Sequence, residues 1–284
     1  MSRLGLNLAE SRIGKPENLE RRIIAVQRRG TLGADVHGNA TRGCFDSRWR
    51  QEDRMAMNRP IERQDGGTYE SRAVAEGWRS GAAARAQFLG PLTEAMLDVA
   101  GVTSGSRVLD VADGTGEQTL MAARRVGPTG SIVATDIAPR MLAVAAEAAQ
   151  QAGLTNVETR VLDARRLDLE PESFDAAISR LALMLIPERE QALVGVRRVL
   201  KPGSKLAAVV LSAPARNPFT ALPVAIARRH AGLPPMPVED PGLFALGDAA
   251  IFRAVYERAG FRDVAVHAVP VLRRFPSVGA ALQF

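Results

Sequence analysis

Between Arg107 and Leu211, short apolar runs alternate with longer stretches of helical character, and this alternation limits the possible folds more than any other feature of the chain. The short runs suit buried strands, and parallel strands need right-handed crossovers with helices on both faces of the sheet. We therefore predict a doubly wound, mostly parallel α/β sheet. The expected strands are Arg107–Val111, Ser131–Asp136, Val157–Leu162, Phe174–Ser179 and Lys205–Leu211, and the expected helices are Gly116–Val126, Pro139–Ala152 and Glu188–Leu200.

The first of these strands runs directly into a glycine-containing turn, Asp113-Gly114-Thr115-Gly116. Glycines let a strand turn at once into a helix, and they let a ligand lie against bare backbone at a helix N-terminus, which favours an anionic group. Asp136 closes the next apolar run, where a carboxylate can accept both hydroxyls of a ribose. The pair predicts a ligand with a ribose at one end and a small charged group at the other.

Two cofactor classes fit this pair, and an ordinary strand–helix turn without a ligand is the third interpretation. A dinucleotide fingerprint requires a third glycine, but Thr119 stands at that position. The alternative is an acidic residue followed by a glycine-rich turn, which Asp110, Ala112, Gly114 and Gly116 provide. In these residues the chain resembles class I S-adenosylmethionine-dependent methyltransferases, within the subgroup related to quinone-biosynthesis C-methyltransferases.

Further matches extend this resemblance over about Tyr69–Phe275. The run Phe174–Ser179 looks like the fourth strand of that family, and Arg198–Gly203 resembles its turn into the fifth. The resemblance implies a Rossmann-like methyltransferase sheet and S-adenosylmethionine as cofactor. We expect the cofactor contacts to come from Asp110, Ala112, Asp113, Gly114, Thr115, Gly116, Asp136, Ile137, Met141, Asp163, Ala164, Ser179 and Arg180.

Two of these positions carry open alternatives. The resemblance implies that the Asp163 carboxylate meets the adenine amino group while the Ala164 N–H reaches a ring nitrogen; capping of the next turn is the alternative role for Asp163. At position 113 related sequences usually have a small residue or cysteine. The Asp113 carboxylate would either accept a hydrogen bond from the cofactor's ammonium or repel its carboxylate.

The chain divides into an extension and one domain. We expect 1–64 to be a disordered basic extension, with 13 basic and 8 acidic residues and at most one short helix at Leu19–Arg29. The domain, 65–284, is predicted to hold N-terminal helices at 65–104 with a break at Gly90-Pro91, a cofactor-binding core at 105–211, a proline-rich substrate lid at 212–247, and a C-terminal helix and strand at 248–284. The resembled family continues to a seventh, antiparallel strand. We therefore expect this sheet to lack that last strand and to leave an unpaired edge.

The composition of the chain limits the kinds of partner and the location that we expect for it. No apolar run approaches the roughly 20 residues that span a bilayer, and no signal peptide is evident, so a cytoplasmic location is expected. The single cysteine, Cys44, excludes an intramolecular disulfide and a multi-cysteine metal site, and no metal is expected. The charge of 65–284 is close to balanced, which disfavours nucleic acid and leaves a small molecule as the expected partner.

The predicted reaction is methyl transfer to a small apolar or aromatic acceptor. Methyl transfer from a sulfonium needs positioning more than side-chain chemistry. No obvious base is present: His230 is the candidate, with a surface role as the alternative. Two further hypotheses are a catalytically impaired or truncated cofactor-binding protein and a dinucleotide-dependent oxidoreductase.

Overall fold

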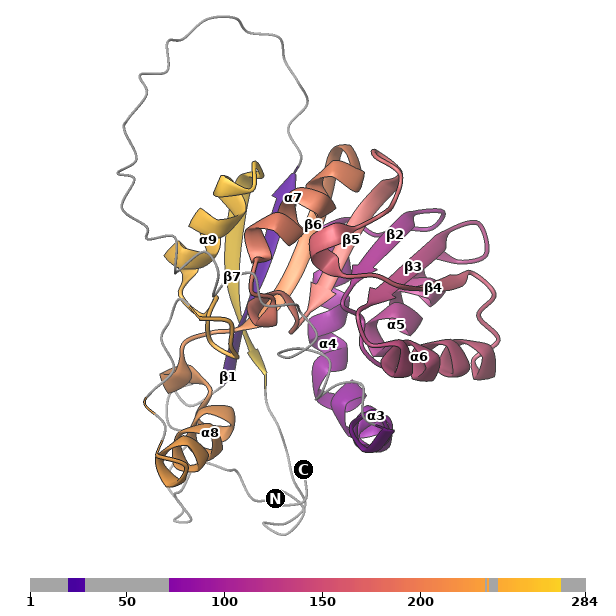
Figure 1. Ribbon diagram of the computed structural model, residues 1–284. Helices are drawn as coiled ribbons and strands as arrows, with labels where there is room; N and C mark the ends of the chain where they lie inside the picture. The colour runs from indigo at the N-terminus through magenta and orange to yellow at the C-terminus, as the bar shows by residue number, and fades with distance from the viewer. Residues whose placement is uncertain (1–19, 29–71, 233, 235–239, 272–284) are drawn as a thin grey trace, which may run out of the picture.

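The structure is a computed structural model that describes residues 20–28, 72–232, 234 and 240–271. A single seven-stranded sheet runs through it in the order β4-β3-β2-β5-β6-β1-β7, with helices on both faces (Figure 1). The strands are β1 (Glu20–Arg28), β2 (Arg107–Val111), β3 (Ser131–Asp136), β4 (Val157–Val161), β5 (Phe174–Arg180), β6 (Leu200–Leu211) and β7 (Arg262–Val271). The helices are α3 (Arg72–Ser80), α4 (Ala82–Ala100), α5 (Glu117–Val126), α6 (Pro139–Gln151), α7 (Arg189–Val199), α8 (Pro218–His230) and α9 (Ala249–Arg258), with short 3-10 turns at Ala164–Arg166, Leu183–Leu185 and Pro214–Arg216.

Strands β2 to β6 are parallel neighbours, which confirms the predicted doubly wound sheet. Strand β2 lies at its centre, paired with β3 on one side and β5 on the other. Chain order therefore reverses next to β2, and ligands in open α/β sheets bind at the carboxyl ends of strands at such a point. The predicted bounds of β2 and β3 agree with the structure to the residue.

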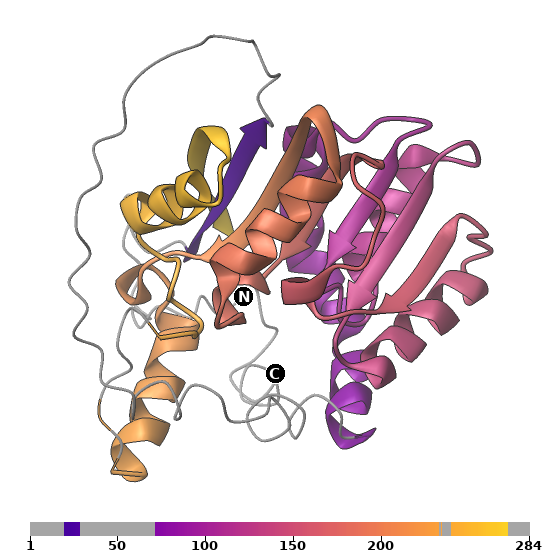
Figure 2. The ribbon, with the colours of Figure 1, turned by 45° about the horizontal axis from the view of Figure 1, so that its top comes forward.

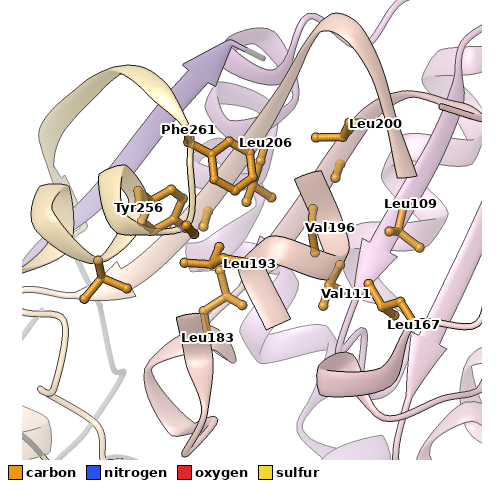
Figure 3. Close-up of a cluster of buried hydrophobic side chains, with 14 of the residues drawn as sticks. Leu109, Val111, Leu167, Leu183, Leu193, Val196, Leu200, Leu206, Tyr256 and Phe261 are labelled. Carbon is orange, nitrogen blue, oxygen red and sulfur yellow. The ribbon is translucent and has the colours of Figure 1, made fainter. Parts of the chain in front are cut away.

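The side chains of β2 alternate between two apolar layers. Leu109 and Val111 face the layer that includes Leu193 and Val196 of α7 (Figure 3), where α9 also contributes. Val108 belongs to the opposite layer, formed with α4 and α5. Figure 2 shows α7 and α9 together on one face of the sheet. Burial on both faces explains why β2 reads as a nearly continuous apolar run.

The sheet has a strand that the sequence did not predict, and it comes from the N-terminal segment. Strand β1 lies between β6 and β7 and is antiparallel to both, with Ile24 opposite Val209 on one side and His267 on the other. An antiparallel strand is therefore present beside β6 that the sequence did not predict, while the segment after β7, where the last strand of the family would lie, is outside the described residues. Among the described strands, β7 is paired with β1 alone.

This strand also corrects the interpretation of 1–64. Disorder was expected there, with a short helix at Leu19–Arg29 at most, whereas Glu20–Arg28 form a strand. The segment includes the β-branched residues Ile23, Ile24 and Val26, which suit strands. Two neighbouring strand edges offer it backbone partners, and this tertiary context outweighs the weak helical spacing. The rest of 1–64 lies outside the described residues.

The N-terminal helices differ from the expectation in their break point. Helix α4 runs without interruption from Ala82 to Ala100 and contains Pro91, and the break lies at Gly81 instead of Gly90-Pro91. Leu89, Leu92 and Met96 are buried against the sheet, and this packing holds the helix together across the proline. Proline costs a helix one hydrogen bond, which burial of this face offsets.

In the C-terminal part, the predicted helix and strand are present as α9 and β7. Helix α8 falls within the predicted lid segment and has no buried residue. Both figures show it projecting from the body of the molecule. Among the described residues, no helix combines the length and apolarity that a bilayer span requires.

Candidate cofactor site

The turn after β2 has the backbone that only glycine accommodates easily. Gly114 and Gly116 have φ of 72° and 93°, in the left-handed region. A Cβ on Gly116 would lie 2.9 Å from the Cα of Ala145 on α6, too close for any side chain. The turn is therefore pressed against α6 at the start of α5, as a backbone cradle at a helix N-terminus requires. Ala112 also has a positive φ, 54°.

Asp110, near the end of β2, links the turn to α5 through side-chain hydrogen bonds. Its carboxylate accepts hydrogen bonds from the Thr119 hydroxyl at 2.7 Å and from the Gln118 side-chain amide at 3.2 Å, both on α5. The residue is fully buried, and desolvation raises its pKa to about 6 despite these donors. Thr119, the position where a dinucleotide motif would have glycine, thus has a structural partner within the turn.

Asp136 ends β3 beside the same turn. Its two carboxylate oxygens accept backbone N–H groups from Gly114 and Ala138, each at 2.9 Å. A carboxylate offers about four acceptor positions, so these two contacts do not exhaust its capacity to bind a ligand. Burial raises its pKa, although these N–H groups oppose the shift. Free acceptor positions next to a glycine cradle fit the two hydroxyls of a ribose.

Asp113 lies inside the turn instead of on its surface. Its exposed fraction is 4%, and neither side-chain oxygen has a hydrogen-bond partner among the described residues. Burial first, and then the Asp110 carboxylate, raises the pKa of Asp113 well above its usual range. The two contacts with the cofactor that the sequence suggested for Asp113 remain predictions.

A buried ionic network at the end of β5 was not foreseen in the sequence. Arg180 donates to the Thr93 hydroxyl at 2.9 Å and to Glu117 at 3.0 Å, and Glu117 also pairs with Arg85. The network ties α4, α5 and β5 together beneath the glycine turn. Its members are far apart in the chain, so only the position of Arg180 at a strand end was a usable signal.

Ser179 and Thr115, two further expected cofactor residues, form internal hydrogen bonds. The Ser179 hydroxyl donates to the Val111 carbonyl at 3.0 Å, which ties β5 to β2. The Thr115 hydroxyl donates to Glu117 at 3.1 Å. Both residues are nearly fully buried.

Asp163 has the turn-capping role that was left open. Its carboxylate accepts the backbone N–H of Arg165 at 2.9 Å and pairs with the guanidinium of the same residue at 2.8 Å. Burial is the largest single effect on the pKa of Asp163 and raises it, but the contacts with Arg165 together outweigh burial, so the pKa is lowered. Ala164 begins the 3-10 turn that follows. The predicted adenine contacts remain predictions.

The other expected residues are divided between the site and the surface. Ile137 is exposed next to Asp136, and Met141 is buried on α6 with its methyl group 3.8 Å from where a Cβ of Gly114 would lie. His230 is exposed at the C-terminal end of α8. Within the described parts of the chain, no three histidine, cysteine or acidic side chains gather as metal ligands would.

Comparison with known proteins separates the two cofactor classes. A family model described as a methyltransferase domain matches residues 102–223, which include the glycine turn, Asp136 and Asp163. The chain carries a class I S-adenosylmethionine-dependent methyltransferase domain. The dinucleotide interpretation is therefore set aside.

Relatives of this methyltransferase domain include the ubiquinone/menaquinone biosynthesis C-methyltransferase UbiE of Pseudomonas aeruginosa, 37% identical over 122 residues, and that of Pseudomonas fluorescens, 38% identical over 119 residues. The matches cover 43% and 42% of this chain and 48% and 46% of the relatives, so the chain spans about half the length of the curated relatives it matches. A solved structure with the same fold is phosphoethanolamine N-methyltransferase 2 of Haemonchus contortus, with a TM-score of 0.50 and 23% identity over 66% of this chain and 43% of that one.

Proposed function

We propose that this chain transfers a methyl group from S-adenosylmethionine to a ring carbon of a small aromatic acceptor of the quinol type, which gives up the proton of that carbon while the cofactor leaves as S-adenosylhomocysteine. The observation that carries the proposal is the glycine turn, in which Gly116 lies against Ala145. Beside this turn, the carboxylate of Asp136 accepts backbone N–H groups from Gly114 and Ala138 and can still accept hydrogen bonds from a ligand. The acceptor class is supported by relatives that are named as C-methyltransferases of quinone biosynthesis.

The residues of the turn supply binding and orientation. Asp136 would accept the ribose hydroxyls, while Gly114 and Gly116 admit the methionine end against bare backbone. Asp163 and Ala164 would lie against the adenine. The bound cofactor supplies an activated methyl group on its sulfonium, and the protein's part is to align an acceptor with it and exclude water.

The acceptor side would be formed by the segment 212–247. Phe219 is half-buried on α8, and Phe244 packs against the core between β6 and α9. These aromatic side chains suit an apolar ring better than a charged substrate. The histidine and acidic residues of 212–247 are His230, Glu239 and Asp240, and His230 is exposed at the end of α8. An acceptor that is already ionised, or activated by its own hydroxyl groups, therefore fits the proposal best.

The proposal is tested by incubating the full chain with S-adenosylmethionine carrying a radiolabelled methyl group and with demethylated benzoquinols and naphthoquinols. We expect label in the organic extract, on a ring carbon as judged by fragmentation of the product. Cofactor binding without transfer to any acceptor in a broad extract would contradict the proposed activity. It would favour a cofactor-binding protein without turnover.

A further inference from the structure

The carboxyl groups of Asp110 and Asp113 form a buried pair under the glycine turn. The two residues are 0% and 4% exposed, and they lie three positions apart in the same strand–turn segment. Asp110 is satisfied by Thr119 and Gln118, whereas neither oxygen of Asp113 has a hydrogen-bond partner among the described residues. Ionisation of both of two neighbouring buried carboxyl groups is costly in free energy, because burial and mutual repulsion both disfavour the second charge.

No cation pairs directly with Asp113 among the described residues. The charged groups that act on it are Asp110 on β2, Asp136 on β3 and Arg180 on β5. Arg180 is already held by Glu117 of α5 and by the Thr93 hydroxyl, and Glu117 also pairs with Arg85. Carboxyl groups thus outnumber the cations that act on Asp113, and a bound cation would offset this imbalance.

The direction of the pKa shifts agrees with the burial of the two carboxyl groups. Burial raises the pKa of Asp110 to about 6, and burial together with Asp110 raises the pKa of Asp113 well above its usual range. Both shifts favour the protonated form of the pair in the free protein. A positive charge placed nearby favours the ionised form of a carboxylic acid, so it would shift this equilibrium toward release.

We infer that the Asp110–Asp113 pair gives up one proton to solvent when the sulfonium cofactor binds at the turn, so that the chain favours this cation over its neutral-sulfur product. The inference rests on the proposed function and adds a specificity-determining role for Asp113. S-adenosylmethionine carries one positive charge more than S-adenosylhomocysteine, at the sulfur.

The test is isothermal titration calorimetry of the full chain in buffers of equal pH and different ionisation enthalpy. The slope of the observed enthalpy against the buffer enthalpy counts the protons released. At pH 7 we expect close to one proton for S-adenosylmethionine and clearly fewer for S-adenosylhomocysteine. Between pH 5.5 and 7.5 the affinity for S-adenosylmethionine should rise by up to about tenfold per pH unit.

Asp113→Asn keeps the shape of the side chain and removes its proton, so it should reduce the count toward zero and narrow the affinity ratio between the two ligands. Asp113→Ala gives a second variant if the amide disturbs folding, and exposed Asp168→Asn is the matched control. Binding with equal or zero proton release for both ligands in the wild type would overturn the inference alone. Failure of both ligands to bind would instead overturn the proposed function.

Discussion

The hydroxyl of Thr119 donates to Oδ2 of Asp110 over 2.7 Å, and both residues are fully buried. This contact fixes the first turn of α5 to the end of β2. Thr119→Val keeps the side-chain shape but leaves a buried carboxylate oxygen short of a donor, so we expect a loss of about 1–3 kcal/mol in the free energy of unfolding. Urea unfolding measures it. Thr155→Val, at an exposed threonine, should change stability by less than about 0.5 kcal/mol; equal effects would contradict the role of Thr119.

Gly116 combines a left-handed backbone with a close neighbour, and the two effects can be separated. Gly116→Ala adds a Cβ at φ 93° and 2.9 Å from Ala145, whereas Gly153→Ala adds one at φ 68° with open space around it. The control should cost about 1–2 kcal/mol from backbone strain. We expect Gly116→Ala to cost clearly more in thermal unfolding and to weaken cofactor binding. Similar losses for both variants would show that contact with α6 is unimportant.

The raised pKa of Asp113 makes the stability of the free protein depend on pH. An acid whose folded-state pKa is raised contributes stability that is fully present below its unfolded pKa of about 4 and is lost as pH rises toward the folded value. Asp113→Asn removes this loss. Relative to wild type, the variant should therefore gain stability between pH 4 and pH 8.

Urea midpoints without cofactor, taken at both pH values, measure this difference. Asp168→Asn, at an exposed position, should show no comparable change. A constant difference between wild type and Asp113→Asn at the two pH values would mean that the Asp113 carboxyl titrates normally in the folded state.

Strand β1 bridges β6 and β7, so a break in its ladder should release β7. At Ile24, paired with Val209 and His267, proline removes a backbone donor from the middle of a central strand. We expect Ile24→Pro to cost about 3 kcal/mol or more. Hydrogen exchange should accelerate in β7 while β2 and β3 stay protected. Unchanged exchange in β7 would contradict the position of β1 in the sheet.

Local sequence patterns predicted the parallel part of the fold well. Strands β2 and β3 are buried on both faces and end in a glycine turn and an aspartate, so their bounds and the ribose candidate followed from period, turn chemistry and spacing. The same reasoning located the N-terminus of α5, because Gly114 and Gly116 stand where a left-handed backbone is needed.

Features that depend on distant partners did not follow from the sequence. Glu20–Arg28 become a strand because β6 and β7, far along the chain, offer open edges. Helix α4 continues past Pro91 because its buried face is held by the sheet. The ionic link between Arg180 and Glu117 has no local pattern, and the inward position of Asp113 depends on how the turn packs.

The central claim is that the turn after β2, together with Asp136, holds S-adenosylmethionine. The most direct measurement is equilibrium dialysis of the full chain with labelled S-adenosylmethionine, in wild type and in Asp136→Ala, with unlabelled S-adenosylhomocysteine or NAD as competitor. We predict saturable binding that S-adenosylhomocysteine displaces and NAD does not, weakened at least about tenfold by the substitution, which corresponds to about 1.4 kcal/mol. Unchanged affinity in Asp136→Ala, or selective displacement by NAD, would contradict the assignment.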